Sequence, residues 1–520
     1  MKNIVVVGGG TAGWLTALYA KKMLPQENII LIESSEIGIL GAGEGSAPIF
    51  TAFLNSLDIN VEDLIKKTKS TIKTSIKFTN WSSSNNYYYH DFSYPDSLFF
   101  DSFINIHDSY YDLPHIKYER IRNILKNNKN YSENDFLHDN NLVPFSFKDI
   151  VNYGTNSIND FNNYLNYAFH FDARLLAGFL SEIGISRGIK VIDGKIIEIK
   201  NNEKNQISSL VLQDSQNIST DFVFDCSGFS KLLIGKHYKS EWKSFSEYLP
   251  MKKALPFFID IDPNNIPPYT EAIAMKYGWI WKIPLQHRYG CGYVFDSDYA
   301  DEEEIKKEIE QYLGYKPQYP REVNGAFSFN AGVFENVWIE NCLSVGLASG
   351  FLEPLEATSI VQLVSLLQNF FFQKHAMFSE NKEIRKILNE QYVKETTMIA
   401  DFLSLHYVTN KTNSDFWIDF ENKNKKSKFL LDRLTLLQNS TMTHKFDDQW
   451  YVSYNYYTVA LGNEIINIEN LKNIYYSNNI DKVEKEMEDF SRTKRNFINN
   501  FIPHSHFLKY MGGFNNEKNN

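Results

Sequence analysis

The chain has 520 residues, of which 43% are hydrophobic and 15% aromatic, and its 53 basic and 63 acidic side chains give a formal net charge of −10. The high aromatic content excludes an intrinsically disordered protein. The acidic balance argues against nucleic-acid binding, because proteins that bind phosphate backbones carry a basic excess. Three cysteines are too few for a disulfide framework and predict buried, reduced thiols.

A nucleotide-binding pattern occupies the N-terminus. It consists of a strand, a GxGxxG turn, a helix, a second strand and an acid, at Ile4–Val7, Gly8 to Gly13, Trp14–Met23, Ile29–Ile32 and Glu33. In this fingerprint Gly8 permits a tight turn, Gly10 a close approach of the backbone to a pyrophosphate, and Gly13 the packing of helix on strand. Glu33 is expected to accept hydrogen bonds from ribose hydroxyls. The context of strand, turn, helix and acid therefore predicts a dinucleotide site.

The remaining chain predicts a mixed architecture. Hydrophobic patterning indicates a hairpin within Lys190–Leu212, a buried strand at Phe222–Phe224 and one long helix from Glu353 to His375. Tyr87–Tyr89 and the region from Asn127 to Asn141 are expected to be loops. From about Lys382 the pattern is mostly helical.

No membrane or metal site is predicted. The apolar stretch Ile360–Phe372 is too short and too polar to span a bilayer, so the protein is expected to be soluble and cytoplasmic. Neither a CxxC nor an HExxH motif occurs, and the pair His504 and His506 is expected at the surface.

Three further segments carry chemistry. The small residues of Gly41–Pro48 indicate backbone running close to a ligand. Ser344–Pro354 predicts a strand, a glycine turn and a helix start, whose free N–H groups favour an anion. In Gly278–Pro284 the motif WxWxIP places Trp279 and Trp281 on one face of a strand, where they would be core residues in most proteins.

Together these motifs resemble the flavin-dependent halogenases of the tryptophan halogenase family. Further matches to this family are Lys73–Trp81, His170–Ala173, Asp225–Phe229 and Phe351–Ile360. The resemblance implies an α/β fold, with a Rossmann-like FAD-binding module of the flavin monooxygenase type over residues 1–380. A mainly helical substrate-covering region, residues 381–520, would pack on this module.

The resemblance also implies an activity. Reduced FAD (FADH2), O2 and a halide ion (bromide, chloride or iodide) would form hypohalous acid, which halogenates an electron-rich aromatic compound such as an indole or a phenol. Lys73 would bind hypohalous acid or be halogenated by it, with Lys77, expected on the same strand face, as the weaker candidate. Glu356 would position the oxidant and take the ring proton. Without the motif, Lys73 would be a solvated strand lysine and Glu356 an acid favoured at a helix start.

The resemblance assigns the remaining site residues by motif position. The cofactor residues are Gly8, Gly10, Thr11, Ala12, Gly13, Glu33, Gly43, Glu44, Gly45, Ser46, Gly346 and Leu347; the halide residues are Thr358 and Ser359; the barrier between flavin and substrate is Trp279, Trp281, Ile283 and Pro284; the substrate pocket is Phe103, Pro354, Trp450 and Tyr451.

Two departures from the family bear on the halide and on the substrate. Ser359 stands where members that act on free tryptophan commonly have glycine, and its added hydroxymethyl group is expected to reshape the halide pocket, which leaves the preference among chloride, bromide and iodide open. Phe446 stands where those members have a glutamate that binds the amino group, so free tryptophan is expected to be a poor substrate. A flavin-dependent aromatic hydroxylase and a non-catalytic flavoprotein remain the alternatives.

The sequence also bears on partners. Only one dinucleotide fingerprint is evident, and it is assigned to FAD, so a separate NAD(P)H-dependent flavin reductase is expected to supply reduced flavin. The sequence does not decide between a monomer and a homo-oligomer.

Overall fold

A mostly parallel sheet, in which only the edge strand β21 is antiparallel, carries the predicted nucleotide fingerprint. The structure, a computed structural model, describes residues 1–36, 43–84, 87–92, 114–127, 129–146, 166–320, 325–379, 381–439, 450–451, 453–476 and 480–513. The sheet has the order β21-β22-β13-β1-β2-β9. These strands span Trp338–Ile339, Cys342–Ser344, Phe222–Asp225, Asn3–Val7, Asn28–Glu33 and Lys190–Asp193.

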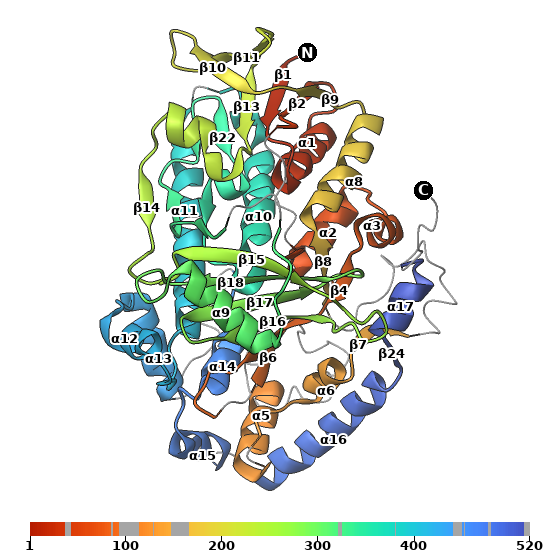
Figure 1. The fold of residues 1–520 in the computed structure, drawn as a ribbon, viewed down its shortest axis with the longest axis vertical. Helices are drawn as coiled ribbons and strands as arrows, with labels where there is room; N and C mark the ends of the chain where they lie inside the picture. The colour runs from red at the N-terminus through yellow and green to blue at the C-terminus, as the bar shows by residue number, and fades with distance from the viewer. Residues whose placement is uncertain are drawn as a thin grey trace.

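The nucleotide fingerprint lies where the sequence predicts it. β1 pairs in parallel with both β2 and β13, which is the arrangement of a Rossmann-like unit. Helix α1 (Thr11–Met23) follows β1 and packs on α8 (Ala173–Ser186) and α10 (Thr358–Phe372). In Figure 1 this sheet stands near the N-terminus, and α10 and α11 (Lys382–His406) run from it toward a second sheet.

The second sheet is mostly antiparallel and has the order β19-β15-β18-β17-β16-β5-β6. These strands span Phe327–Ser328, Lys253–Ile259, Tyr289–Phe295, Gly278–Pro284, Tyr269–Ala274, Ser75–Thr79 and Tyr87–Asp91. Its two faces belong to different cores, because side chains alternate along a strand. On β17, Trp279 and Trp281 join the main core, whereas Ile280 packs with Ile305 and Ile309 of α9 (Glu302–Leu313).

A small antiparallel sheet carries the glycine-rich segment and Lys73. It has the order β3-β8-β4, with β3 at Gly43–Gly45, β8 at Ala168–Asp172 and β4 at Thr71–Lys73. His170 in the central strand is opposite Gly45 on one side and Thr71 on the other. Strands β3 and β4 therefore lie on either side of β8 in the same small sheet.

The C-terminal part is mainly helical, as expected. Its helices after α11 are α12 (Asp415–Lys423), α13 (Lys428–Gln438), α14 (Ser453–Gly462), α15 (Ile468–Tyr476), α16 (Ile480–Ile498) and α17 (His504–Tyr510). The main core contains residues from both sides of position 380. The division into 1–380 and 381–520 stays a prediction.

The other elements surround these layers. The remaining helices are α2 (Pro48–Ser56), α3 (Val61–Thr68), α5 (Pro114–Asn127) and α6 (Glu133–Asp139), with short helical turns at Gly228–Ser230, Leu232–His237, Gly346–Ala348 (η4), Leu355–Ala357 (η5) and Lys374–Ala376. The remaining strands are β7 (Leu142–Ser146), β10 (Ile196–Asn201), β11 (Ile207–Leu212), β12 (Asn217–Ser219), β14 (Trp242–Ser244), β20 (Gly332–Phe334), β23 (Gly350–Phe351) and β24 (Phe501–Pro503). The expected hairpin within Lys190–Leu212 is the antiparallel pair of β10 and β11.

Three expectations about local structure were wrong. Tyr87–Tyr89 belong to strand β6, in which Tyr88 and Tyr89 are buried and Tyr87 is exposed, and α6 lies inside the region expected to be a loop. The expected helix from Glu353 is interrupted, because Glu356 has a φ of 65° and α10 begins only at Thr358. His504 is fully buried, and its Nε2 accepts a hydrogen bond of 2.9 Å from the backbone N–H of Ile72.

Helix α10 belongs to the core. Among the described residues, Leu355–Phe372 is the stretch long and apolar enough to cross a membrane by length and composition, and 67% of it is buried inside the protein. It packs on α1, α2 and α11. The three cysteines are buried and unpaired, as expected.

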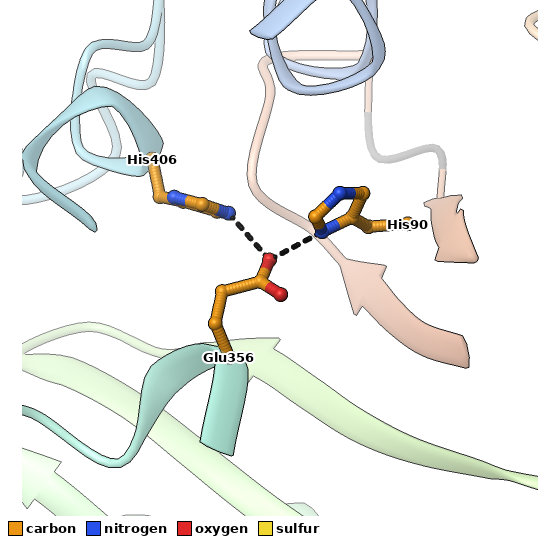
Figure 2. Close-up of side chains that lie close together, drawn as sticks. All are labelled: His90, Glu356 and His406. Atoms are coloured by element: carbon orange, nitrogen blue, oxygen red, sulfur yellow. Dashed lines mark hydrogen bonds and ion pairs between the residues drawn. The ribbon is translucent and has the colours of Figure 1, made fainter. Parts of the chain in front are cut away.

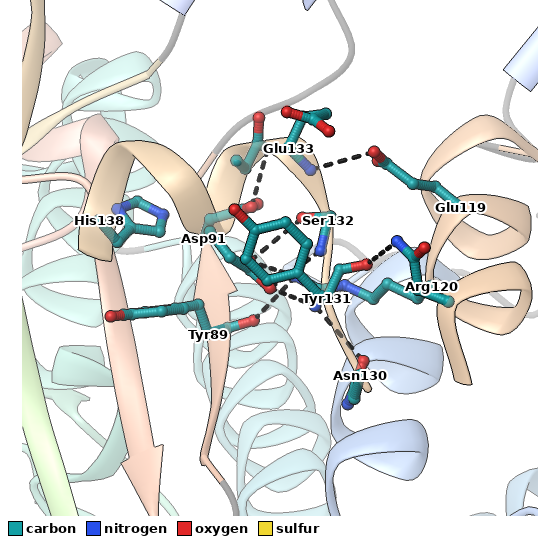
Figure 3. A network of polar contacts seen from close by, with 12 residues as sticks. Tyr89, Asp91, Glu119, Arg120, Asn130, Tyr131, Ser132, Glu133 and His138 are labelled. Atoms are coloured by element: carbon teal, nitrogen blue, oxygen red, sulfur yellow. Dashed lines mark hydrogen bonds and ion pairs between the residues drawn. The ribbon is translucent and has the colours of Figure 1, made fainter. Parts of the chain in front are cut away.

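A buried polar network fixes the end of β6 (Figure 3). The guanidinium of Arg120 donates two hydrogen bonds of 3.0 Å to the carboxylate of Asp135, in the two-pronged geometry of strong charge pairs. Asn134 and Tyr454 each donate a hydrogen bond of 2.8 Å to Asp91, the residue after His90. Strand β6 is thereby tied to α6 and α14.

Candidate active site

The turn between β1 and α1 leaves space for a ligand backbone. Gly8 has a φ of 118°, and a Cβ there would lie 2.2 Å from the carbonyl oxygen of Cys226. A Cβ at Gly13 would lie 1.8 Å from the carbonyl oxygen of Gly8, so helix and turn touch there. At Gly10, the N-cap of α1, a Cβ would meet no atom within 4 Å. The described residues therefore enclose Gly8 and Gly13 but leave Gly10 open.

The start of α1 suits a phosphate group. No side chain caps this terminus and no acidic residue lies in its first turn, so the N–H groups near Thr11 and Ala12 are available to an anion. Glu33 ends β2 close to Gly9, and burial together with the charge of Asp193 raises the pKa of Glu33. These features fit the diphosphate and ribose of FAD.

The segment at Gly346 lies against the same helix. Gly346 has a φ of 67° in η4, and a Cβ there would lie 2.8 Å from the Cβ of Ala12. Gly346 and Leu347 are both half-buried. Two of the three glycine-containing segments expected to bind the cofactor, residues 8–13 and 346–347, therefore meet although they are far apart in the sequence.

Lys73 is buried beside the glycine-rich segment. It has no exposed surface, and its Nζ donates a hydrogen bond of 3.0 Å to the carbonyl oxygen of Ser46. A Cβ at Gly45 would lie 3.3 Å from Nζ, so only a small residue fits opposite the amine. Burial lowers the pKa of Lys73 to about 7, although the charge of Glu356 opposes this shift. Lys73 can therefore be neutral near physiological pH.

Lys77 does not share this environment, contrary to expectation. The chain leaves the small sheet at Thr74, whose N–H donates to the carbonyl oxygen of Pro268 at 2.7 Å. Lys73 ends β4, whereas Lys77 lies in β5 of the second sheet, half-buried and 3.9 Å from the ring centre of Tyr87. The lysines belong to different sheets because β5 pairs with β16 and β4 pairs with β8.

Strand β17 lies between the glycine-rich strand and α11. All four residues assigned to the barrier are buried, namely Trp279, Trp281, Ile283 and Pro284. Ile283 contacts Gly43, and the carbonyl oxygen of Pro284 accepts a hydrogen bond of 2.6 Å from Thr71. On the other side, the indole N–H of Trp279 donates to the hydroxyl of Tyr407 at 2.9 Å.

Glu356 is the centre of a buried cluster (Figure 2). Its Oε1 lies 2.6 Å from Nδ1 of His90 and 2.9 Å from Nε2 of His406. The three side chains come from η5, β6 and α11. His90 and His406 lower the pKa of Glu356 below its usual range and overcome the opposing effect of burial.

The same three side chains are of the types that bind metal ions. Their candidate ligand atoms lie within 4.8 Å of one another. The separations of 2.6 and 2.9 Å between nitrogen and Oε1 are those of hydrogen bonds, each of which holds a hydrogen between its two atoms. A metal ion requires these nitrogens to be free of hydrogen, so the arrangement is that of a proton-bearing cluster.

The start of α10 offers a second anion site. Its N-cap Ala357 has a φ of 55° and provides no side-chain cap. The hydroxyl of Thr358, which is 2% exposed, has no hydrogen-bond partner among the described residues. Ser359 is half-buried beside it. An unpaired buried hydroxyl at a helix N-terminus suits a halide ion.

Aromatic side chains lie close to this cluster. Tyr451 stacks on Phe402 with ring centres 3.7 Å apart, and Phe402 contacts the rings of both His90 and His406. The ring centre of Phe92 lies 5.0 Å from Nζ of Lys73. Trp450 and Pro354 are half-buried. Phe103 and Phe446 lie outside the described residues.

Sequence reasoning missed His90, His406 and Tyr407. His90 follows tyrosines expected in a loop, and His406 and Tyr407 end the long helix α11. One signal was available, because His406 follows an apolar run at the end of a helix, where a polar side chain needs a buried partner.

Comparisons with known proteins identify the family of this chain. The family model for tryptophan halogenases matches residues 3–474. Tryptophan 6-halogenase SttH of Streptomyces toxytricini is 29% identical over 425 residues, covering 80% of this chain and 80% of that protein. Tryptophan 7-halogenase RebH of Lentzea aerocolonigenes is 29% identical over 444 residues, covering 80% and 78%.

Solved structures have the same fold. The flavin-dependent halogenase Xcc4156 from Xanthomonas campestris superposes with a TM-score of 0.83 at 27% identity, covering 98% of each chain. Fold and cofactor cradle thus define a flavoprotein with a Rossmann-like FAD-binding module. More narrowly, the chain belongs to the tryptophan halogenase family and is a flavin-dependent halogenase.

Proposed function

We propose that the protein uses FADH2, O2 and a halide to form hypohalous acid and halogenates an electron-rich aromatic compound such as an indole or a phenol. Lys73 and Glu356 are the proposed catalytic residues. The observation that carries this proposal is that Lys73 is completely buried and interacts electrostatically with the buried Glu356. Burial destabilises the charged form of an amine, and buried lysines with a lowered pKa occur preferentially at functional sites.

The bound flavin would supply the two-electron oxidation of halide by O2. The N-terminus of α1, with Thr11 and Ala12, would hold its diphosphate, and Glu33 its ribose. The ring system of the flavin would lie between two segments. These are Gly43, Glu44, Gly45 and Ser46 on one side and Gly346 and Leu347 on the other. Burial and the charge of Asp172 raise the pKa of Glu44 to about 7, so this side chain can reach the flavin without a full charge.

Lys73 would receive the oxidant as a neutral amine. Its nitrogen attacks the halogen of HOX, so that an N–X bond forms, the O–X bond breaks and water leaves. The aromatic ring then takes X from the nitrogen, and the amine regains its proton. Glu356 accepts the proton from the cationic ring intermediate, which restores the aromatic system. Lys73 can alternatively hold HOX by a hydrogen bond and direct the same transfer.

The halide would be held by Thr358 and Ser359 at the start of α10. Bromide, chloride and iodide are all candidates, and Ser359 is expected to influence the choice between them. A barrier would keep the substrate away from the flavin, so that hydroxylation of the substrate does not compete with halogenation. It would consist of Trp279, Trp281, Ile283 and Pro284.

The substrate would lie over Tyr451, with Trp450 and Pro354 near it, and Phe103 is a further candidate. The relatives SttH and RebH are named as tryptophan halogenases. Free tryptophan is still proposed to be a poor substrate here, because Phe446 offers no carboxylate to the amino group of the substrate.

The proposal also includes the source of reduced flavin, the cellular location and the roles of the two parts of the chain. A separate NAD(P)H-dependent reductase would deliver reduced flavin, and the protein would work in the cytoplasm. Residues 1–380 would form the FAD-binding module, and residues 381–520 would cover the substrate.

The experiment is product analysis by mass spectrometry. The protein is incubated with indole, phenol or free tryptophan, together with FAD, NADH, a flavin reductase and bromide, chloride or iodide. A monohalogenated indole or phenol, formed only when halide is present, supports the proposal. A hydroxylated product that forms without halide would replace it with a hydroxylase, and efficient halogenation of free tryptophan would refute the substrate assignment.

A further inference from the structure

The hydrogen bonds around His406 fix its protonation state. Its Nδ1 lies 3.1 Å from the carbonyl oxygen of Phe402, which can only accept a hydrogen bond. Its Nε2 lies 2.9 Å from Oε1 of Glu356, which also only accepts while the carboxylate is ionised. Both ring nitrogens of His406 must then carry hydrogen, so the ring is positively charged.

The neighbouring His90 also bonds to Glu356 (Figure 2), but its other ring nitrogen has a different kind of partner from that of His406. The side-chain amide nitrogen of Asn455 lies 2.8 Å from its Nε2 and can only donate a hydrogen bond. Nε2 is therefore the acceptor nitrogen, and Nδ1 carries the hydrogen that it donates to Glu356 at 2.6 Å. His90 is a neutral donor, so the two histidines differ in charge although both bind the same carboxylate oxygen.

We propose that His406 is a positioning residue that carries the positive charge paired with Glu356. Lys73 is then not required as the counter-charge of this carboxylate. The inference rests on the proposed catalytic roles of Glu356 and Lys73. Because Glu356 is negative and His406 is positive, the net charge of the cluster is zero without any contribution from Lys73. An amine that is not needed as a counter-charge can stay neutral, which is the form that reacts with HOX.

The backbone at Glu356 supports a positioning role. Glu356 and Ala357 have φ values of 65° and 55°, which non-glycine residues rarely adopt. Such a conformation persists only where the surroundings hold it, and the two imidazoles are bonded to the side chain that it presents. Both imidazoles donate to Oε1 of Glu356, at 2.6 and 2.9 Å, and hydrogen bonds of this kind favour the ionised carboxylate.

Few other titratable groups face this cluster among the described residues. Lys73 lies on β4, and Tyr88 on β6 has its pKa raised by burial and by the charge of Glu356. Tyr407, which follows His406 at the end of α11, is bonded to Glu353. The rings of Phe78 and Phe402, with centres 4.9 and 5.1 Å from that of His406, exclude water from it. Removing the charge of His406 would therefore change the pKa values of Glu356 and Lys73 more than those of other groups.

The first test needs no turnover. The chain has 12 histidines, which are labelled with 15N in the ring, and the signal of His406 is identified by its loss in H406Q. In the wild-type protein at pH 7.5, both nitrogens of His406 are expected to resonate as protonated. In E356Q, one ring nitrogen of His406 should lose its hydrogen and resonate as an acceptor. A wild-type His406 with one protonated nitrogen would overturn the inference, even if the enzyme halogenates.

The second test compares halogenation rates. H406Q keeps a donor near Glu356 but no charge, and is expected to lower kcat at least about tenfold, as expected for a lost charge-assisted contact. Its activity should also require a higher pH, by about one unit, because Lys73 becomes the counter-charge of Glu356. H138Q changes another buried histidine, on α6, and should behave as wild type.

A double-variant cycle separates a direct effect from loss of structure. In the E356Q background the substitution H406Q should change kcat less than about twofold, because its partner charge is already absent. A full effect of H406Q in E356Q would overturn the inference. If the wild-type protein halogenates nothing while His406 is doubly protonated, only the proposed function fails.

Discussion

The indole N–H of Trp279 donates a hydrogen bond of 2.9 Å to the hydroxyl of Tyr407. That hydroxyl in turn donates to the carboxylate of Glu353, whose other oxygen accepts the backbone N–H of Met251 at 3.0 Å. The WxWxIP strand and the segment before α10 are thus joined by the residue next to His406. The end of α11 therefore holds both the barrier and Glu356.

Replacing Tyr407 by phenylalanine should destabilise the protein. The substitution leaves the buried N–H of Trp279 and the carboxylate of Glu353 without this partner, at a cost of about 1–3 kcal/mol. The midpoint of urea unfolding should decrease, whereas Y510F, at a residue that is 44% exposed, should not change it. Equal midpoints for wild type and Y407F would show that the hydroxyl contributes nothing.

Glu353 should make stability depend on pH. Burial raises its pKa to about 7, above the value in the unfolded chain. A group with a raised pKa stabilises the fold fully below its unfolded pKa, and this contribution is lost as pH rises through 7. E353Q should therefore be more stable than wild type at pH 8 but not at pH 5, as thermal unfolding at both values would show. Parallel curves would contradict the assignment.

Thr358 should affect halide binding and not folding. Because its hydroxyl has no partner among the described residues, T358V removes no hydrogen bond from the fold and should leave the melting temperature unchanged. The KM for bromide should rise about tenfold, as expected for a lost hydrogen bond to an anion. An unchanged KM would place the halide elsewhere.

Arg120 should be essential for stability. R120M leaves Asp135 as an uncompensated buried charge, which costs about 3–5 kcal/mol. The double variant R120M/D135N removes both charges and should recover part of this loss in chemical unfolding. If R120M alone were as stable as wild type, the network of Figure 3 would not anchor β6.

The N-terminal fingerprint was predictable because its determinants are local. A strand, a glycine turn and a helix follow each other within 33 residues, and their geometry depends on nearby residues. The same holds for the hairpin of β10 and β11. The helical C-terminal region was predictable from its periodicity alone.

The catalytic surroundings depend on contacts that sequence patterns do not contain. Thr74 separates Lys73 from Lys77 because its backbone bonds to Pro268, the residue before strand β16. The helix expected from Glu353 is broken at Glu356, where the side chain is held by His90 and His406. In both cases tertiary hydrogen bonds override local propensity. The motif identified the residues, but their environment came only from the structure.

The most direct test of this account compares two lysine substitutions in one assay. K73M and K77M are incubated with indole, bromide, FAD, NADH and a flavin reductase, and bromoindole is measured by mass spectrometry. K73M should form less than about 1% of the wild-type product, a loss of about two factors of ten in rate. K77M, at a half-buried position in a different sheet, should retain most of it. Full bromination by correctly folded K73M would contradict the central claim that halogen passes through Lys73.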